Sequence, residues 1–429
     1  MKVFKFGGAS INSPKAIKNI VDVIKSQEFE KLVVVVSAMG KTTNALEDIL
    51  KFYVQRDIKN LDEKLRELKE YHNEIILELF GDKTDVKLYN LFDELDFQLS
   101  KEPSDNFDYD YDQIVSQGEL ISTKIISQYL NLQAIENRWL DARQLIRTDS
   151  NYRDAKVEWE TSAEKIEHCV SEYFNFENNR VVVTQGFIGA TAELSSTTLG
   201  REGSDFSAAI FGHILNAQDV TIWKDVPGLL NADPKLMPDA VLLDEISYGE
   251  TVELAFFGAS IIHPKTIKPL QNKKIPLRVK SFIQYNNRGS IIKDIKSKIT
   301  VPCFIFKKNQ ALISISTLDF SFIGEENLSL IFGLFAHFGI KINLMQNSAI
   351  SFSVCAEFNN IDKFYALVEE LKTEFKVRYN LNMELITIRN YDEDIAKHIL
   401  QNRKIYIEQR DRTTLQMVVN ASNKKSVDS

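Results

Sequence analysis

The sequence has 429 residues, of which 26% are charged, and its formal net charge is −8 at pH 7. That length allows about three domains with buried cores, and the acidic balance argues against nucleic acid or an anionic membrane as a partner. No apolar run is long enough for a signal segment or a membrane span, and Cys169, Cys303 and Cys355 are too far apart for a zinc site or a disulfide framework. These features predict a cytoplasmic protein that handles small molecules and has no metal site of its own.

The chain begins with KVFKFGGAS at residues 2–10, where a lysine interrupts an apolar strand-like run that leads into two glycines. Alternation alone would place Lys5 on the solvated side of an edge strand, before an ordinary turn. Paired glycines, however, also let backbone N–H groups and a helix N-terminus approach a phosphate, whose charge a lysine neutralises. This stretch by itself leaves both interpretations open.

Short β-rich runs alternate with helical ones as far as about residue 298. The apolar runs at 31–40, 180–189 and 219–228 each end in glycine, which is typical of strands buried in a mostly parallel sheet. Residues 204–215 have a helical pattern between two of these runs. We therefore predict an α/β fold for residues 1–298, a three-layer sandwich of helices around a parallel-type sheet.

Two regions differ from this alternation. Residues from about 55 to 112 have leucines at helical spacing among many charges, which predicts a helical insertion with a solvated outer face and no assigned chemistry. From residue 299, elements between about 310 and 383 follow the order β-α-β-β-α-β of a small split βαβ domain. A shortened echo at about 384–420, with 299–310 as a candidate to complete it, predicts a regulatory region of two small α+β modules at 299–429.

The stretch TTLGREGSDFSAA at 197–209 places Arg201 in a glycine-flanked loop, before a helix that Ser204 can cap and whose first turn holds Asp205. A capped helix with a solvated arginine is one interpretation. The other is a carboxylate or phosphate site, because a guanidinium group binds such anions bidentately. In WKDVPGLLNADPK at 223–235, Asp225 follows a strand and Asp233 lies in a turn, which is a plausible nucleotide wall because ligands of open α/β sheets bind at the carboxyl ends of strands.

Taken together, these stretches resemble the ordered signatures of aspartate kinases, a branch of the amino acid kinase superfamily. The matching stretches are residues 5–8, 37–38 with 43–44, 117–119, 184–189, 198–201, 203–205, 225–228, 233–234, 244–246 and 263–264. The tail, NQALISIS at 309–316 through INLMQNSA at 342–349, resembles the family's first ACT domain. The resemblance covers nearly the whole chain and implies transfer of the γ-phosphoryl group of MgATP to the side-chain carboxylate of L-aspartate, the first step toward lysine, threonine and methionine.

The resemblance also implies roles for individual residues, with Lys5 and Asp205 catalytic. ATP and its phosphates would meet Lys5, Gly7, Gly8, Ser10, Lys224, Asp225, Asp233 and Lys235, with Mg²⁺ carried mainly by the nucleotide. Aspartate would meet Ser37, Thr43, Glu119, Phe187, Thr198, Arg201 and Ser204. Arg201 would bind its α-carboxylate and Glu119 its α-ammonium group. No general base is expected, because an aspartate side chain with a pKa of about 3.9 is already ionised at neutral pH.

For the tail, the resemblance implies an amino-acid effector site near Phe320, Asn343 and Ser348, and a homodimer through the ACT region. Lysine-inhibited members commonly have acidic side chains at that site, whereas this sequence has Asn343 and Ala349. A neutral site does not offset the desolvation of a cationic side chain. We therefore predict weak or absent lysine inhibition, with threonine as the alternative effector.

Three positions depart from the family's pattern. Ala9 stands where threonine is usual, Glu202 where glycine is frequent, and Ser260 where many members have a lysine that meets the nucleotide phosphates, for which Lys265 is a candidate substitute. These departures keep open a catalytically weak or inactive amino-acid-sensing paralogue. An amino acid kinase for another acidic substrate is the remaining alternative, although we would expect it to lack the helical insertion and the paired ACT-like tail.

Overall fold

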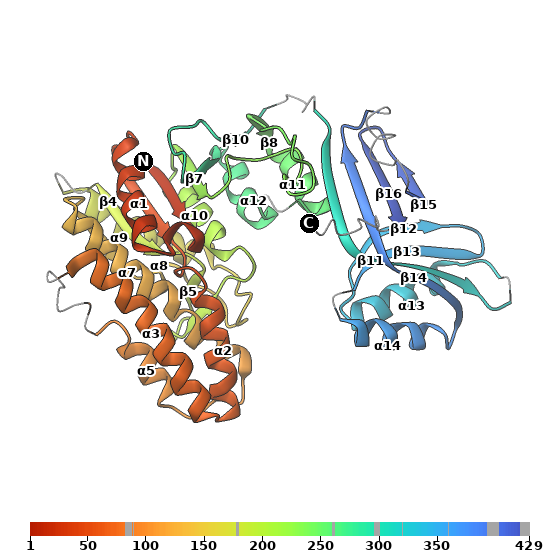
Figure 1. The fold of residues 1–429 in the computed structure, drawn as a ribbon, viewed down its shortest axis with the longest axis horizontal. Helices are drawn as coiled ribbons and strands as arrows, with labels where there is room; N and C mark the ends of the chain where they lie inside the picture. Colours follow the sequence, from red (N-terminus) through yellow and green to blue (C-terminus); the bar gives the residue numbers. More distant parts are fainter. Residues whose placement is uncertain are drawn as a thin grey trace, which may run out of the picture. The chain divides into compact units, whose positions relative to one another are not determined.

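The computed structural model describes residues 1–81, 88, 90–176, 180–259, 262–295, 301–319, 321–358, 360–392 and 403–420. The chain divides into two compact units (Figure 1). One consists of Met1–Leu229, Leu242–Val252 and Ile261–Ser297, and the other of Leu230–Val241, Glu253–Ser260 and Lys298–Ser429. Within the described ranges, no helix combines the length and the apolar character that crossing a membrane requires.

An eight-stranded sheet forms the centre of the first unit, with the strand order β3-β4-β2-β1-β7-β9-β10-β8. Its strands are β1 (Lys2–Phe6), β2 (Leu32–Val36), β3 (Asn137–Leu140), β4 (Val181–Gln185), β7 (Asp219–Lys224), β8 (Glu245–Ser247), β9 (Leu277–Ser281) and β10 (Ser290–Lys293). All neighbouring strands run parallel except β9 and β10. Strands β5 (Ile188–Ala190) and β6 (Ser196–Thr198) form a separate antiparallel pair. The predicted parallel α/β core is confirmed.

Helices cover both faces of this sheet. The helices of the first unit include η1 (Gly8–Ile11), α1 (Pro14–Ser26), α2 (Thr42–Gln55), α3 (Ile58–Phe80), α5 (Asp93–Leu99), α6 (Phe107–Val115), α7 (Gln117–Leu132), α8 (Ala142–Leu145), α9 (Trp159–Phe174), α10 (Gly203–Ile214) and α12 (Pro264–Asn272). On one face, Phe4 and Phe6 of β1 share a buried core with α1, α2, α3 and α7. Because successive side chains of a strand point to opposite faces, Val3 and Lys5 point to the other face, against which α10 packs.

The segment predicted as a helical insertion contains helices α3, α5 and α6. Helix α3 begins where the Asp57 side chain accepts a hydrogen bond from the Asn60 N–H (3.3 Å), a usual N-cap, and it packs against α2 (Figure 1). Leu68, Ile75 and Leu79 of α3 enter the core at helical spacing, while the intervening charged side chains face solvent.

The second unit contains a six-stranded antiparallel sheet with the order β12-β13-β11-β14-β16-β15. Its strands are β11 (Cys303–Thr317), β12 (Ile342–Asn347), β13 (Ser351–Glu357), β14 (Phe375–Arg389), β15 (Ile405–Arg410) and β16 (Thr414–Asn420). The long strands β11 and β14 pair from end to end and join both predicted modules into one sheet. Helices α13 (Glu325–His337) and α14 (Ile361–Leu371) pack on one face of it (Figure 1). The helix predicted near 395–401 lies outside the described residues.

Candidate active site

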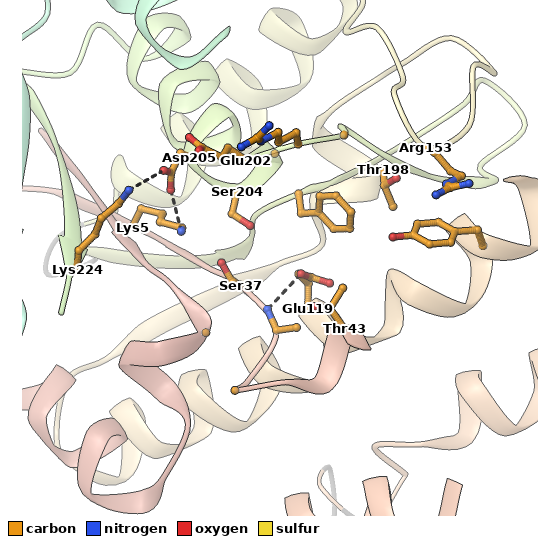
Figure 2. Close-up of a pocket in the computed structure, with 18 residues that line it drawn as sticks. Lys5, Ser37, Thr43, Glu119, Arg153, Thr198, Glu202, Ser204, Asp205 and Lys224 are labelled. Atoms are coloured by element: carbon orange, nitrogen blue, oxygen red, sulfur yellow. Dashed lines mark hydrogen bonds and ion pairs between the residues drawn. The ribbon is translucent and has the colours of Figure 1, made fainter. Parts of the chain in front are cut away.

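A cleft of about 620 Å³ opens at the carboxyl ends of the central strands of the first unit (Figure 2). The strand order reverses at β1, because the chain continues to β2 on one side and later to β7 on the other. Such a switch point is where open α/β sheets bind their ligands. The lining residues are Lys5, Gly8, Ser37, Ala38, Gly40, Thr43, Tyr111, Glu119, Arg153, Phe187, Thr198, Gly200, Arg201, Glu202, Gly203, Ser204, Asp205 and Lys224.

Lys5 lies at the centre of the sheet, since β1 is hydrogen-bonded to β2 on one side and to β7 on the other. Its side chain is only 11% exposed, and its ammonium nitrogen lies 2.7 Å from the Oδ1 atom of Asp205, in the first turn of α10. The Nζ atom of Lys224, at the end of β7, lies 3.8 Å from Oδ2 of the same carboxylate (Figure 2). One buried carboxylate therefore orients two lysines, and the three groups carry a net positive charge that suits a phosphate.

The backbone beside this charged group is held close to the next loop by glycine. A Cβ atom on Gly8 would lie 2.8 Å from the carbonyl oxygen of Ala38, closer than side-chain carbons approach backbone. The amide of Gly40 donates to the carbonyl of Gly8 at 3.1 Å. The glycine turn after β1 and the loop after β2 thus form one continuous wall at the end of the cleft whose positive charge suits a phosphate.

Glu119, in the first turn of α7, has a buried carboxyl group that faces the same cleft (Figure 2). Its Oε1 atom accepts a hydrogen bond from the Ala38 N–H at 3.2 Å, whereas its Oε2 atom has no hydrogen-bond partner among the described residues. Burial raises the pKa of Glu119 to about 8, although the bond from Ala38 and the charge of Lys5 oppose the shift. A buried carboxyl oxygen without a partner is costly, and a cationic ligand group would offset that cost.

Arg201 is exposed and lies on a loop of the cleft wall that other residues stabilise by direct contacts. Gly200 has a φ of 72°, a left-handed conformation that favours glycine, and a Cβ atom there would lie 2.5 Å from Oδ1 of Asp154 and would displace that carboxylate. The Nζ atom of Lys265 bonds Oδ1 of Asp154 at 2.6 Å and the carbonyl of Leu199 at 3.0 Å. These contacts fix the loop that presents the guanidinium group to the cleft.

The structure brings together most, but not all, of the residues expected at the site. All seven residues expected to meet aspartate line the cleft, as do Lys5, Gly8, Lys224 and Asp205. Gly7 adjoins it, since a Cβ atom there would lie 3.3 Å from the Lys5 Nζ atom. Ser10 is buried, and its hydroxyl donates to the Trp223 carbonyl at 3.5 Å.

The residues expected to form the nucleotide wall divide between the two compact units. Asp225 is exposed directly after β7, whereas Asp233 and Lys235 belong to the second unit, where Oδ1 of Asp233 accepts the N–H of Lys235 at 2.9 Å. Of the expected effector residues, Phe320 lies outside the described residues. Asn343 lies in β12, and Ser348 bonds Ser351 in the turn after that strand.

Sequence reasoning missed the contribution of the helical insertion and of the loop before α9. Tyr111 of α6 and Arg153 both line the cleft, and the centre of the Arg153 guanidinium lies 4.5 Å from the centre of the Tyr111 ring. Burial and the bond that Tyr111 donates to Glu47 (2.8 Å) raise the pKa of the phenol, so it remains a hydrogen-bond donor. The signal that could have revealed Tyr111 is the alternation of aspartate and tyrosine at 108–112, just before Gln117-Gly118-Glu119.

The departures from the family's pattern have distinct structural settings. Ala9 is exposed in η1, and Ser260 lies outside the described residues. Glu202 adopts a φ of 53°, a left-handed conformation that favours glycine, and its Oε2 atom accepts the N–H of His263 at 2.9 Å. One oxygen of the Glu202 carboxylate is thus engaged by a backbone donor. The ammonium group of Lys265 is engaged by Asp154 and Leu199 behind the loop.

The fold and the charges of the site together define a class of protein. The cleft has four cationic side chains and three carboxyl groups, one of them the buried Glu119, at the switch point of a parallel sheet. Such an arrangement suits a phosphate-bearing ligand at one end and a small zwitterion at the other. This is the architecture of a small-molecule phosphoryl-transfer protein.

The chain belongs to the amino acid kinase family, whose model matches residues 1–281. It is 31% identical over 372 residues to the chloroplastic bifunctional aspartokinase/homoserine dehydrogenase 2 of Arabidopsis thaliana, a match that covers 82% of this chain and 39% of that protein. It is 28% identical over 448 residues to the chloroplastic aspartokinase 2 of the same plant, covering 99% and 80%. The crystal structure of Escherichia coli aspartokinase III with lysine and aspartate superposes with a TM-score of 0.82 at 25% identity, covering 98% of this chain and 96% of that one.

Proposed function

We propose that this protein is an aspartate kinase, which transfers the γ-phosphoryl group of MgATP to the side-chain carboxylate of L-aspartate and yields 4-phospho-L-aspartate and ADP. The observation that carries the proposal is the pairing, in one cleft, of the Lys5–Asp205–Lys224 cluster with the buried and half-satisfied carboxyl group of Glu119. The relatives named aspartokinase support the same reaction. The chain spans about two fifths of the length of the bifunctional relatives that it matches, so their second activity is outside this proposal.

The acceptor end of the cleft offers opposite charges for the two ends of an amino acid. Glu119 would bind the α-ammonium group with the oxygen that has no hydrogen-bond partner among the described residues, and Arg201 would bind the α-carboxylate. Thr43 and Thr198 also line this cleft (Figure 2). With both backbone-proximal groups of aspartate held, its side-chain carboxylate is directed toward the lysine cluster.

The chemical step requires positioning and charge neutralisation rather than a base. An oxygen of the aspartate side chain attacks the γ-phosphorus while the bond from that phosphorus to the oxygen bridging the β- and γ-phosphates breaks, and that oxygen leaves on ADP. The aspartate side chain, with a pKa of about 3.9, enters as a carboxylate, so no proton has to be removed. Lys5 and Lys224 would neutralise charge on the phosphates, and Asp205 keeps both ammonium groups aimed into the cleft.

The residues of the cleft fit a metal ion that arrives with the nucleotide. Within the described ranges, no group of three or more histidine, cysteine, aspartate or glutamate residues could hold a metal ion. Mg²⁺ typically keeps several waters and binds through substrate phosphates with few protein carboxylates. Asp205, which already lies between two lysines, would act on the ion through the phosphates, and the ion would neutralise charge on the transferred group.

The direct test is an assay in which hydroxylamine traps the acyl phosphate as aspartyl hydroxamate. We expect the purified chain to form hydroxamate from L-aspartate and MgATP, and to form none when either is omitted. L-glutamate and N-acetylglutamate serve as competing acceptors that would identify another member of the family. A folded chain that forms hydroxamate from neither aspartate nor these acids would be the inactive paralogue, and the proposal would be wrong.

Replacing Arg201 with alanine should impair the use of aspartate and leave that of ATP intact. A bidentate contact between guanidinium and carboxylate contributes about 1.5–3 kcal/mol, so we expect the KM for aspartate to rise roughly 10- to 100-fold. Arg138→Ala, an exposed arginine on β3, is the matched control. If the KM for ATP rises instead, Arg201 contacts the nucleotide and our assignment is wrong.

The second unit is the proposed regulatory and dimerisation region. Its sheet has β12 and β15 at the edges, and exposed edges of this kind are where subunits associate. The homodimer and the effector site both stay predictions. Around Asn343, the Nζ atom of Lys307 donates to Oδ1 at 2.9 Å and the Asn343 amide donates to Gln310 at 2.7 Å, so the polar atoms of that side chain are occupied.

We expect lysine to be a weak inhibitor or none at all. The ammonium group of Lys307 beside Asn343 would repel the cationic tail of an effector in the same place, and a neutral amide cannot compensate. Initial rates measured against rising lysine should show half-inhibition only above about 1 mM, which corresponds to about −4 kcal/mol of binding. Threonine in parallel is the comparison. Half-inhibition by lysine well below that concentration would contradict the prediction.

A further inference from the structure

The buried carboxyl group of Asp112 connects the helical insertion to the wall of the cleft. Asp112 is 0% exposed, near the end of α6. Its Oδ1 atom accepts from the Thr198 hydroxyl at 2.7 Å, and its Oδ2 atom accepts the backbone N–H groups of Thr198 at 2.8 Å and of Arg153 at 3.0 Å. Thr198 and Arg153 both line the cleft, whereas Asp112 does not.

The two residues that Asp112 holds need such a support. Thr198 ends the two-stranded β5–β6 sheet, whose second strand has only one strand partner. Arg153 has a φ of 69°, a left-handed conformation that is unfavourable in a residue with a Cβ atom. A hydrogen bond to its N–H group stabilises that turn, which in turn determines where the guanidinium group stands at the cleft.

From these contacts we infer that Asp112 is a positioning residue for the acceptor: it fixes Thr198 and Arg153 at the acceptor end of the cleft, so that the helical insertion takes part in substrate recognition. The inference rests on the proposed phosphorylation of aspartate. Asp112 acts through its neighbours and touches no substrate itself.

The charge state of Asp112 is consistent with this role. Burial raises the pKa of Asp112 to about 6, although the hydrogen bonds from Thr198 and Arg153 oppose the shift. At neutral pH the group is therefore mainly a carboxylate, whose two oxygens can accept all three bonds at once. The fold retains a buried charge where an apolar side chain would be easier to bury, and the three donors explain its presence.

The adjacent Gln113 provides a matched control on the same turn of α6. Its amide nitrogen donates to the carbonyl of Ser196 at 2.8 Å, and its amide oxygen accepts the N–H of Ser196 at 3.1 Å. Gln113 therefore joins the same helix to the same strand, but its partner Ser196 is not among the residues that line the cleft. A purely structural contribution of α6 to β6 would make Gln113→Ala and Asp112→Ala alike.

Asparagine at position 112 separates geometry from charge. Its side-chain oxygen can accept both N–H groups in place of Oδ2, and its amide can donate to the Thr198 hydroxyl in place of Oδ1. Asp112→Asn should therefore preserve the wall, whereas Asp112→Ala removes all three bonds. If Asp112 acts by positioning, Asp112→Asn should keep the KM for aspartate near that of the wild type. If the negative charge itself were required, Asp112→Asn would be as impaired as Asp112→Ala.

The experiment compares wild type, D112A, D112N and Q113A in the hydroxamate assay, with thermal unfolding of each variant. We expect D112A to raise the KM for aspartate about tenfold, equivalent to about 1.4 kcal/mol, with the KM for ATP within about twofold of wild type. D112N should stay near wild type, and Q113A should lower the unfolding temperature without changing the KM for aspartate.

Each other outcome counts against a specific claim. If D112A leaves the KM for aspartate unchanged, or if Q113A raises it equally, Asp112 is structural only and the inference is overturned. If D112N is as impaired as D112A, the charge rather than the geometry matters, and positioning is again excluded. A wild-type chain that makes no aspartyl hydroxamate overturns the proposed function first, and aspartate as the ligand of this wall with it.

Discussion

Lys5→Met should lower the turnover number by about 100-fold or more while the chain remains folded. The ammonium group of Lys5 is buried at the phosphate-like end of the cleft, 2.7 Å from Asp205, where a fixed charge is not screened by water. Methionine has nearly the same length and fills the same space without the charge. Lys224, whose ammonium nitrogen lies 3.8 Å from Asp205, would then be the remaining cation of the cluster. The measurement is steady-state kinetics in the hydroxamate assay.

The lost charge also leaves Asp205 with less compensation, so some loss of stability is expected along with the loss of turnover. Removing one partner of a buried pair is destabilising, and far-UV circular dichroism with thermal unfolding shows whether the variant is folded at the assay temperature. Lys2→Met, on the same strand but outside the residues that line the cleft, is the matched control. A folded Lys5→Met variant with near wild-type turnover would remove Lys5 from the mechanism.

Glu119→Gln should abolish efficient use of aspartate. It should also make the KM for aspartate and the stability of the folded chain depend less on pH. Glutamine keeps an oxygen for the Ala38 N–H but offers no charge to the α-ammonium group. A hydrogen bond between charged groups contributes about 1.5–3 kcal/mol, so we expect the KM for aspartate to rise roughly 10- to 100-fold. Turnover at saturating aspartate should change less.

The raised pKa of Glu119 determines how this effect depends on pH. With a pKa of about 8, the carboxyl group of Glu119 is mainly neutral at a lower pH when no aspartate is bound. Only its ionised form forms an ion pair with an ammonium group. The KM of the wild type for aspartate should therefore fall as the pH rises from about 7 toward 8. The variant should not show this trend, and a wild-type KM that rises over the same interval would contradict the assignment.

The contribution of Glu119 to the free energy of unfolding should change in the direction opposite to the affinity for aspartate, since it should fall as the pH rises. The folded chain binds more protons than the unfolded chain between pH 4.5 and about 8, because the pKa of Glu119 is raised on folding. The contribution of this group to the free energy of unfolding is therefore largest below pH 4.5 and is lost as the pH rises toward 8. Thermal unfolding at pH 5 and pH 8 should show that Glu119→Gln gains stability relative to wild type at the higher pH. An equal difference at both pH values would show that the pKa is not raised.

The position of Lys5 shows what its local sequence could and could not predict. Its two interpretations, a solvated edge-strand residue and a phosphate ligand, could not be separated from KVFKFGGAS, because alternation describes which side chains share a face and not what covers that face. The pairing of β1 with strands on both sides, and the packing of α10 on the face that Lys5 shares, exclude the solvated interpretation. Those contacts connect residues about 200 positions apart in the sequence.

The positions of Asp112 and Arg153 show the opposite case. An acidic stretch at the end of a charged helical insertion is usually solvent-exposed, so its charge favoured a solvated face over a carboxylate buried against β6. Asp233 and Lys235 are close to Asp225 in the chain but belong to the other compact unit, so their part in a nucleotide wall stays a prediction.

Sequence alone determined the features that depend on local periodicity and on residue types: the buried parallel strands, the helical character of the insertion, the strands and helices of the tail, and the set of side chains suited to an amino acid and a phosphate. These are short-range properties, since the hydrophobic period and the turn chemistry of a segment are set by its own residues. Tertiary structure alone decided which polar groups are desolvated, as it did for Glu119 and Asp112. The reason is physical: a pKa and an unsatisfied hydrogen bond depend on everything packed around a group, and the elements packed around these two carboxyl groups come from distant parts of the chain.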